Sequence, residues 1–360
     1  HTILTQNIDN TIFLDLNVEI IRHINSNRPR AINLKMPFLN NKEIILRLER
    51  FEVFQPNFKL AKTTDQGLIY DKYLPQTVSY RIISNDGFAG TISIFKNTLT
   101  GLIRHNGQVF EIIKIKNNVY ALFNVSDGLI QSNFSCYTES IETINTNNNS
   151  TFSPKKGNGQ LYINIALDVD YSTYAYEFNS NCYDVVEWCI AILAGISEFY
   201  FSELGVAVAT NFIHIWQTIN DPYNTLEVNS QDYLYALKDQ WNAAENFLNI
   251  DRDVVFLLTH HNIGGRAYLG SLCNDYLAYA VTGFTTNNPY YNSPTSYSYS
   301  LKTFAHELGH IIGADHTHAC VWNPDPDFNF TGGAIDNCVV AYDPTWAESC
   351  ISNLESVNLN

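Results

Sequence analysis

The chain has 360 residues, 45% of them hydrophobic, which is enough to build globular cores and excludes a chain that is disordered as a whole. Its net charge of −15 argues against nucleic acid or an anionic membrane surface as a partner. We expect no apolar run long enough to span a membrane, and the length favours two domains.

Residues 1–138 are expected to form a β-rich N-terminal domain. Within Val78–Phe123, the turn signals Asn85-Asp86-Gly87, Asn106-Gly107 and Asn117-Asn118 separate apolar runs at strand-like intervals. Such spacing is typical of a β-meander or a β-sandwich.

Residues 139–160 are expected to be an exposed linker. The segment is polar and contains 145–150, a run of Asn, Thr and Ser with little to bury. Proteases cut exposed linkers, and Lys155-Lys156 would suit activation by a trypsin-like or autolytic cleavage. A plain interdomain tether explains the same composition equally well.

From Leu161 onward, strands and helices are expected to alternate. Apolar residues alternate with the others over 161–169, which predicts a strand with one buried face, and apolar residues at helical spacing predict helices over 185–200 and 234–248. Further elements are expected as strands over Val206–Trp216, Val254–Leu258 and Tyr276–Val281, and as a helix from about Ser300.

The segment from His306 to His316 has the form H-E-x-x-H-x-x-G-x-x-H. His306 and His310 lie four apart on a helix, so both imidazoles can reach one metal ion. Gly313 lets the helix stop and the chain turn, which returns His316 as a third ligand. Three protein ligands leave the fourth position of a tetrahedral Zn2+ ion open, as in a catalytic site. A histidine-rich helix end without metal is the alternative.

Glu307 follows the first of these histidines and is the predicted general base. Zinc lowers the pKa of a bound water toward about 7, and a neighbouring carboxylate can take the proton of that water as it attacks. The motif therefore predicts a zinc-dependent endopeptidase that acts on proteins or peptides.

The motif resembles that of the metzincin metalloproteases. Upstream, Gly264–Cys273 resembles the edge strand before the active-site helix of the adamalysin, or reprolysin-like, group. The resemblance implies an α+β fold with a metzincin catalytic domain over residues 161–360, built on a twisted mixed β-sheet with long helices and an antiparallel edge strand. In that family the edge strand pairs with the extended substrate. The corresponding residues here are Gly265, Arg266, Ala267, Tyr268 and Leu269.

The N-terminal region also resembles the propeptide of adamalysin-type zymogens, through Tyr80-Arg81, Gly90–Ser93, Gly101–Ile103 and Phe110–Ile112. The resemblance implies a latent proenzyme, with a prodomain over residues 1–138 that is held against the catalytic domain in cis. An independent β-domain with a binding role is the alternative.

Cys136 is the sole cysteine of this N-terminal region. Metzincin propeptides often place a cysteine thiolate on the open zinc position, so the resemblance implies that Cys136 is the zymogen zinc ligand. An inert cysteine or an intermolecular disulfide is the alternative.

Six of the seven cysteines follow residue 180, which favours disulfides and a secreted, extracellular protein. The pairing stays open, with Cys320–Cys338 and Cys273–Cys350 as candidates. Cys182 and Cys189 could bridge only if the helix begins after Cys182, because seven helical residues span about 10 Å. The chain opens on His1, and we expect an export signal to have been removed.

The sequence departs from the family at the methionine turn that lies downstream of the third histidine. The single methionine is Met36, so we expect either a substitute residue or an incompletely represented C-terminus. An inactive protease-like binding or adhesion protein is the alternative function, and a zinc hydrolase with another substrate is a second. The intact Glu307 argues against the first alternative.

Overall fold

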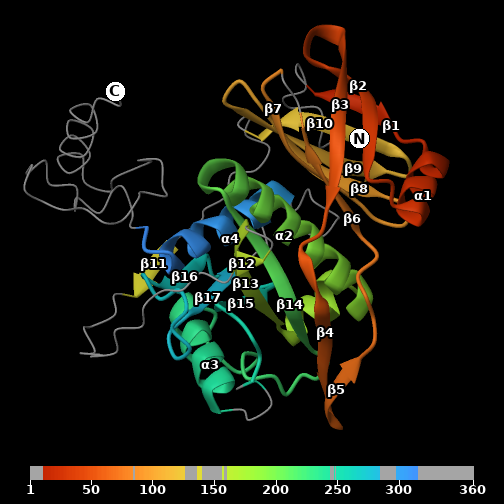
Figure 1. Cartoon of the computed structure of the whole chain (residues 1–360). Coiled ribbons are helices and arrows are strands. Elements are labelled where there is room, and N and C mark those ends of the chain that lie inside the picture. The colour runs from red at the N-terminus through yellow and green to blue at the C-terminus, as the bar shows by residue number, and fades with distance from the viewer. Residues whose placement is uncertain are drawn as a thin grey trace, which may run out of the picture.

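The computed structural model describes residues 11–83, 86–125, 136–139, 156–157, 160–243, 247, 249–283 and 297–314 (Figure 1). Of residues 41, 136–139, 156–157 and 160, only the backbone is described. The described residues form two β-sheets with four α-helices, an α+β fold.

The first sheet is antiparallel throughout and has the strand order β1-β10-β9-β8-β7-β6-β3-β2. Its strands are β1 (Ile12–Asp15), β2 (Ala31–Phe38), β3 (Lys42–Phe51), β6 (Val78–Ile82), β7 (Phe88–Ile94), β8 (Leu99–His105), β9 (Gln108–Lys116) and β10 (Val119–Asn124). Helix α1 (Val18–Asn27) packs on this sheet. From β6 to β10 each strand pairs with the next, which confirms the predicted meander. Asn106 and Gly107 turn the chain with φ of 49° and 74°.

The second sheet is mixed and has the strand order β11-β16-β17-β15-β13-β14-β4-β5, with β12 paired to β13. Its strands are β4 (Phe54–Thr64), β5 (Gly67–Asp71), β11 (Cys136–Glu139), β12 (Lys156–Gly157), β13 (Gln160–Val169), β14 (Val206–Trp216), β15 (Val254–Thr259), β16 (Gly265–Tyr268) and β17 (Tyr279–Gly283). Strands β17, β15, β13, β14 and β4 run parallel, whereas β16 is antiparallel to β17.

Helices cover both faces of the second sheet. Helices α2 (Cys182–Leu204) and α4 (Tyr297–Ile311) share one apolar core with one face, and α3 (Ser230–Ala243) packs on the other. Helix α2 also contacts β6, β7 and β8, so it lies between the two sheets (Figure 1). The predicted strands and helices after Leu161 are therefore confirmed, with boundaries moved by a few residues.

The alternation of β13 divides its side chains between these two cores. Ile165, Leu167 and Val169 belong to the core with α2 and α4. On the opposite face, Ala166 is apolar, whereas Asp168 is a fully buried carboxylate. A buried polar side chain of this kind needs hydrogen-bond partners.

The carboxylate of Asp168 has three such partners. Its oxygens accept from the Tyr223 hydroxyl at 2.7 Å and the Trp241 indole at 2.9 Å, and His214 Nδ1 lies at 2.8 Å. The other ring nitrogen of His214 lies 2.8 Å from Oγ1 of Thr63 on β4. The network thus links β13 and β14 to a strand from the N-terminal part of the chain.

Helix α2 begins and ends where its sequence provides caps. The Asn181 side chain accepts from the Tyr183 amide, and Gly205 closes the helix with φ of 70°. Because Cys182 is its first residue, the helix includes both Cys182 and Cys189, and the two buried thiols are not bridged.

By length and composition alone, α2 could cross a membrane, contrary to the expectation that no run is long and apolar enough. In the fold, 78% of its apolar window is buried inside the protein, which is the position of a core helix.

The sheets do not divide the chain at residue 138. Strands β4 and β5 lie within residues 1–138 but pair with the second sheet. The chain leaves the first sheet after β3, adds two strands to the second, and returns to the first at β6. The predicted domain ranges, 1–138 and 161–360, stay predictions, and the two parts they name share one sheet.

Candidate metal centre

Two of the predicted metal ligands come together on α4. His306 and His310 lie one helical turn apart, and their Nε2 atoms are 3.1 Å from each other. Their ring planes stand at 87°, with both side chains buried. The helical spacing of four residues places both rings on the same face.

The hydrogen bonding of His310 indicates which of its two ring nitrogens could bind a metal. Its Nδ1 atom lies 2.8 Å from the carbonyl oxygen of Ala314. A carbonyl only accepts, so Nδ1 carries the proton and Nε2 keeps its lone pair. Two nitrogens, each about 2.05 Å from one tetrahedral zinc ion, would lie about 3.4 Å apart. The observed separation is close to that value, so the pair fits a zinc ion.

The chain turns after α4 as the sequence predicts. The helix ends at Ile311, and Gly313 has φ of 101°, a conformation that favours glycine. The third predicted ligand, His316, lies outside the described residues. Within the part of the chain that the structure describes, no group of three metal-binding side chains occurs.

The end of α4 that carries the histidines is fastened to the turn after β16. The Gly270 amide donates to the His310 carbonyl at 2.8 Å, and the Leu272 amide donates to the Ile311 carbonyl at 3.0 Å. The Ile311 carbonyl lies in the last turn, where a helix leaves carbonyls without an internal partner, and the His310 carbonyl also accepts from the Gly313 amide at 2.9 Å. The bonds from Gly270 and Leu272 also tie the predicted metal ligands to the predicted substrate strand.

Glu307 lies directly against β16. A Cβ atom added to Gly265 would be 2.0 Å from Oε1 of Glu307 and 2.5 Å from its Cδ. Only glycine leaves room for the carboxylate here, which is itself fully buried. The predicted general base and the predicted substrate strand are therefore in contact.

The predicted substrate strand is shorter than its sequence suggests. Strand β16 includes Gly265, Arg266, Ala267 and Tyr268, and Leu269 follows it in a turn. Its antiparallel pairing with β17 confirms the expected direction. On its other side β16 pairs in parallel with β11, so among the described strands β11 forms the edge of the sheet and β16, which was predicted as the edge strand, is the second from it.

The backbone of Cys136 lies beside the site. In the register of β11 and β16, Cys136 is opposite Gly265 and Glu139 is opposite Tyr268. The Cys136 side chain is not described, so its predicted role as a zinc ligand stays a prediction. The linker residue Lys155 and the cysteines Cys320, Cys338 and Cys350 lie outside the described residues.

Sequence reasoning missed Tyr200, which holds the middle of α4. Its hydroxyl reaches across from α2 and donates to the Ala305 carbonyl at 2.7 Å. Burial, together with the charge of Glu307, raises the pKa of Tyr200. Helical periodicity marks this residue as part of the core, but it cannot show that the hydroxyl reaches the next helix.

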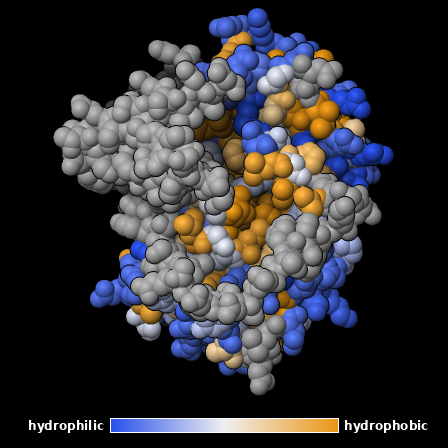
Figure 2. All heavy atoms as spheres, turned by 60° about the vertical axis from the view of Figure 1, so that its left-hand side comes forward, coloured by the Kyte–Doolittle hydropathy of each residue, from blue (hydrophilic) through white to orange (hydrophobic). Residues whose placement is uncertain are grey.

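The face that Figure 1 shows on its left, where α4 and β16 lie, is amphipathic. The space-filling view shows apolar side chains gathered near its middle, with hydrophilic ones around them (Figure 2).

Comparisons with known proteins agree with this geometry. Residues 160–338 match a model of metallo-peptidase family M12, Reprolysin_5. A zinc metalloproteinase-disintegrin-like protein of Cerberus rynchops is 25% identical over 79% of this chain and 48% of its own length. A zinc metalloproteinase-disintegrin-like brevilysin of Gloydius brevicauda is 26% identical over 44% of this chain and 35% of its own. The chain spans about half or less of the length of these relatives.

A solved structure of metalloproteinase-II from Bacteroides fragilis aligns with 84% of this chain and 86% of its own, at 11% identity and a TM-score of 0.45. The match over 160–338 contains the helix with His306, Glu307 and His310, together with β16. The chain therefore carries a metallopeptidase domain of family M12 and belongs to the adamalysin, or reprolysin-like, metzincins.

Proposed function

We propose that this chain is a secreted zinc-dependent endopeptidase that is made in a latent form. The observation that supports it best is the arrangement on α4. Two imidazole nitrogens lie 3.1 Å apart, and Glu307, the residue after His306, has a buried carboxylate that contacts β16. His306 and His310, with His316 as the third ligand, would hold the zinc ion.

Zinc at this position would polarise the scissile carbonyl and make a water molecule acidic enough to attack it. Glu307 takes the proton of the attacking water and delivers it to the amine that leaves. Its contact with Gly265 keeps the carboxylate next to the strand on which a peptide would lie. The Gly270 and Leu272 amides hold the helix end in register with that strand.

Latency is proposed from the pairing of β11 with β16. An extended peptide substrate would add to the same edge through main-chain hydrogen bonds. Because β11 occupies that edge, it excludes a peptide from β16. In the register of these two strands, Cys136 is opposite Gly265, the residue that contacts Glu307. We therefore propose the thiolate of Cys136 as the zinc ligand of the latent form.

The test measures zinc content and peptidase activity together, on the intact chain and on the chain cleaved in the linker. We expect one bound zinc per chain, and activity that rises after cleavage. Glu307→Gln should lower that activity by roughly 10²–10⁴-fold while zinc is retained. The exposed Glu19→Gln serves as the matched control. A chain that binds zinc but is inactive in both forms would favour the protease-like binding protein.

Latency has its own test in Cys136→Ser. The uncleaved variant should show higher basal activity than the uncleaved wild type, because serine is a much poorer zinc ligand than a thiolate. Cys273→Ser, at an exposed cysteine, is the control for a general effect of cysteine removal. Unchanged latency in Cys136→Ser would contradict the proposed ligand.

A further inference from the structure

Strand β4 belongs to the second sheet, although it comes from the N-terminal region of the chain. It pairs in parallel with β14, with Phe212 opposite Lys59 and Trp216 opposite Thr63. Strand β5 then continues the sheet beyond it. In Figure 1, β4 and β5 run along the edge of the lower sheet, although the neighbouring strands β3 and β6 belong to the upper one.

The side chains of β4 are buried on both of its faces. Leu60 and Phe58 belong to the core that also contains α2 and α4. Ala61, on the opposite face, belongs to the core under α3. Leu60 and Ala61 are fully buried, so β4 packs as an interior strand does.

Removing β4 would turn β14 into an exposed edge. The last seven residues of β14 are buried, including Ile213 and His214, which have no exposed surface. His214 would also lose Thr63, the partner of its Nε2 atom. A long apolar strand with unpaired backbone groups is an aggregation hazard, which natural proteins avoid.

Polar contacts join the same N-terminal region to α2. Glu187 on α2 accepts from the Gln76 amide at 2.8 Å, from the amide and hydroxyl of Thr77, and from the Tyr73 hydroxyl. These donors lie in the segment between β5 and β6. The carboxylate is thus held by four donors of the N-terminal region.

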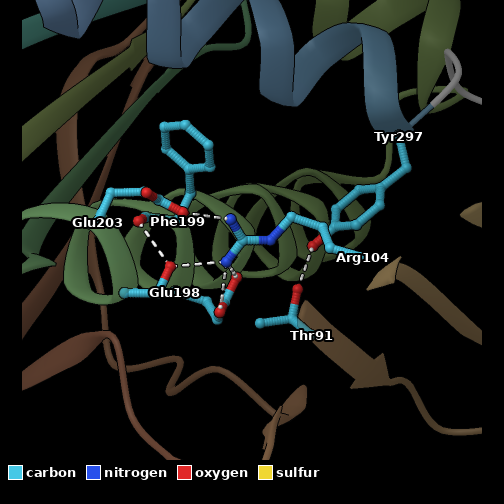
Figure 3. Close-up of polar contacts among 7 residues, drawn as sticks. Thr91, Arg104, Glu198, Phe199, Glu203 and Tyr297 are labelled. Carbon is cyan, nitrogen blue, oxygen red and sulfur yellow. Dashed lines mark hydrogen bonds and ion pairs between the residues drawn. The ribbon is translucent and has the colours of Figure 1, made fainter. Parts of the chain in front are cut away.

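A second group of contacts surrounds Arg104 on β8 (Figure 3). Its guanidinium lies 3.0 Å and 3.2 Å from the two oxygens of Glu198, and donates to Glu203 at 2.8 Å and Ser202 at 2.6 Å. The Glu198 side chain is only 5% exposed. All three acceptors lie near the C-terminal end of α2, so one arginine fastens the first sheet to this helix.

The N-terminal end of α4 is held in the same way. Glu111 on β9 is buried and accepts from the Tyr297 amide at 2.9 Å, the Ser298 amide at 3.4 Å and the Ser298 hydroxyl. A carboxylate at this position caps the first amides of the helix and complements its dipole. The helix with the predicted metal ligands therefore has its cap on the N-terminal region.

We infer that the N-terminal region stays bound after the linker is cut, so that the active form is a noncovalent complex of two chains. The inference rests on the linker cleavage of the proposed function. Cleavage would free the segment that carries Cys136 from its covalent tether to β13. It would leave β4, Arg104 and Glu111 in place.

The test places a recognition sequence for a highly specific protease between Asn147 and Asn148 of the full chain. After complete cleavage, native size-exclusion chromatography at nanomolar concentration should show both fragments in one peak, separable only in denaturant. Two separate peaks, or loss of the N-terminal fragment with aggregation of the rest, would overturn the inference. Glu307→Gln should give the same profile, because association does not depend on activity.

A second measurement is the dissociation rate of the cleaved complex. Arg104→Ala leaves Glu198 buried without its cation and should speed dissociation at least about tenfold. Lys35→Ala is the control, since Lys35 and Glu43 form an exposed pair on the first sheet. Equal rates in the two variants would overturn the role given to Arg104.

Activity separates this inference from the proposed function. Fragments that stay together without peptidase activity would count against the endopeptidase. They would leave the association standing but overturn the claim that the complex is the active form. Activity in a separated C-terminal fragment would support the endopeptidase and overturn the complex.

Discussion

The second sheet is extended on both sides by strands from the N-terminal region. Strand β11 adds to β16 at one side, and β4 adds to β14 at the other. Both additions are parallel, so both use the same kind of backbone hydrogen bonding. Strand β11 is at one end of the strand order, and β4 is followed only by β5 at the other, with α4 and its histidines on the β16 side.

The two additions differ in length and in what they join. Strand β11 has four residues in register and lies next to the strand that contacts Glu307. Strand β4 has eleven residues, is covered by β5 and has buried side chains in both cores. Backbone pairing alone does not decide whether a strand can be displaced. The apolar surface that it buries does, at about 25 cal/mol per Å².

The largest expected effect comes from Leu60→Ala on β4. Leu60 is fully buried in the core shared with α2 and α4. Truncation should lower the free energy of unfolding by about 2–5 kcal/mol, because it leaves a cavity. Ile69→Ala on β5 is the control, since that side chain is 43% exposed. Urea unfolding measures the free energy of unfolding of both variants. Similar losses of this free energy would mean that β4 contributes no more than a surface strand does.

On the β16 side, Gly265→Ala should act on activity rather than stability. The new Cβ would displace Glu307, and a misplacement of about 1 Å can cost roughly 100-fold in rate. Gly205→Ala is the matched glycine control, because its Cβ would meet no atom within 4 Å while its φ of 70° still imposes strain. We expect the Gly205 variant to lose stability and keep its rate. An unchanged kcat in Gly265→Ala would contradict the proposal that β16 positions Glu307 for catalysis.

Thr63→Val tests the polar contact between β4 and the sheet. It removes the hydroxyl 2.8 Å from His214 Nε2, inside a network with no exposed imidazole surface. A buried polar atom left without its partner costs about 1–3 kcal/mol. Thr64→Val, one residue further along, removes a hydroxyl whose partners are exposed. Equal unfolding free energies for the two variants would show that β4 is held by apolar contacts alone.

The sequence was sufficient to predict the elements after Leu161 and the pairing of His306 with His310. Periodicity and a fixed spacing on one helix are local properties, and they survive without knowledge of the fold. The meander from β6 to β10 was also predictable, because its turns are two-residue signals between neighbouring strands.

The crossing of β4 into the second sheet could not be predicted in the same way. Its partner on β14 lies about 150 residues downstream, and nothing in its own pattern distinguishes one sheet from the other. The same holds for Glu111, whose partner Tyr297 lies 186 residues away. Local patterns name a strand, whereas its neighbours follow from the packing of the whole chain.

The smallest expected effect concerns Asp221, which lies in neither of the two added strands, β11 and β4. Its carboxylate accepts from the Tyr171 amide, so it joins the segments that follow β13 and β14. Burial raises the pKa of Asp221 from 3.8 to about 6. The folded state therefore binds more protons than the unfolded state between these values, and this contribution to stability falls as pH rises through about 6.

Asp221→Asn removes that titration without changing the shape of the side chain. The free energy of unfolding of the wild type, relative to the variant, should fall by roughly 1 kcal/mol between about pH 5 and pH 7. Urea unfolding at both pH values measures it, and the same comparison with Asp239→Asn, at a side chain 75% exposed, provides the control. A difference that rises with pH would mean that the amide donors of Tyr171, Tyr223 and Asn224 outweigh burial. The carboxylate would then be a stabilising ion, and the loops at this end of the sheet would be held by charge rather than by packing.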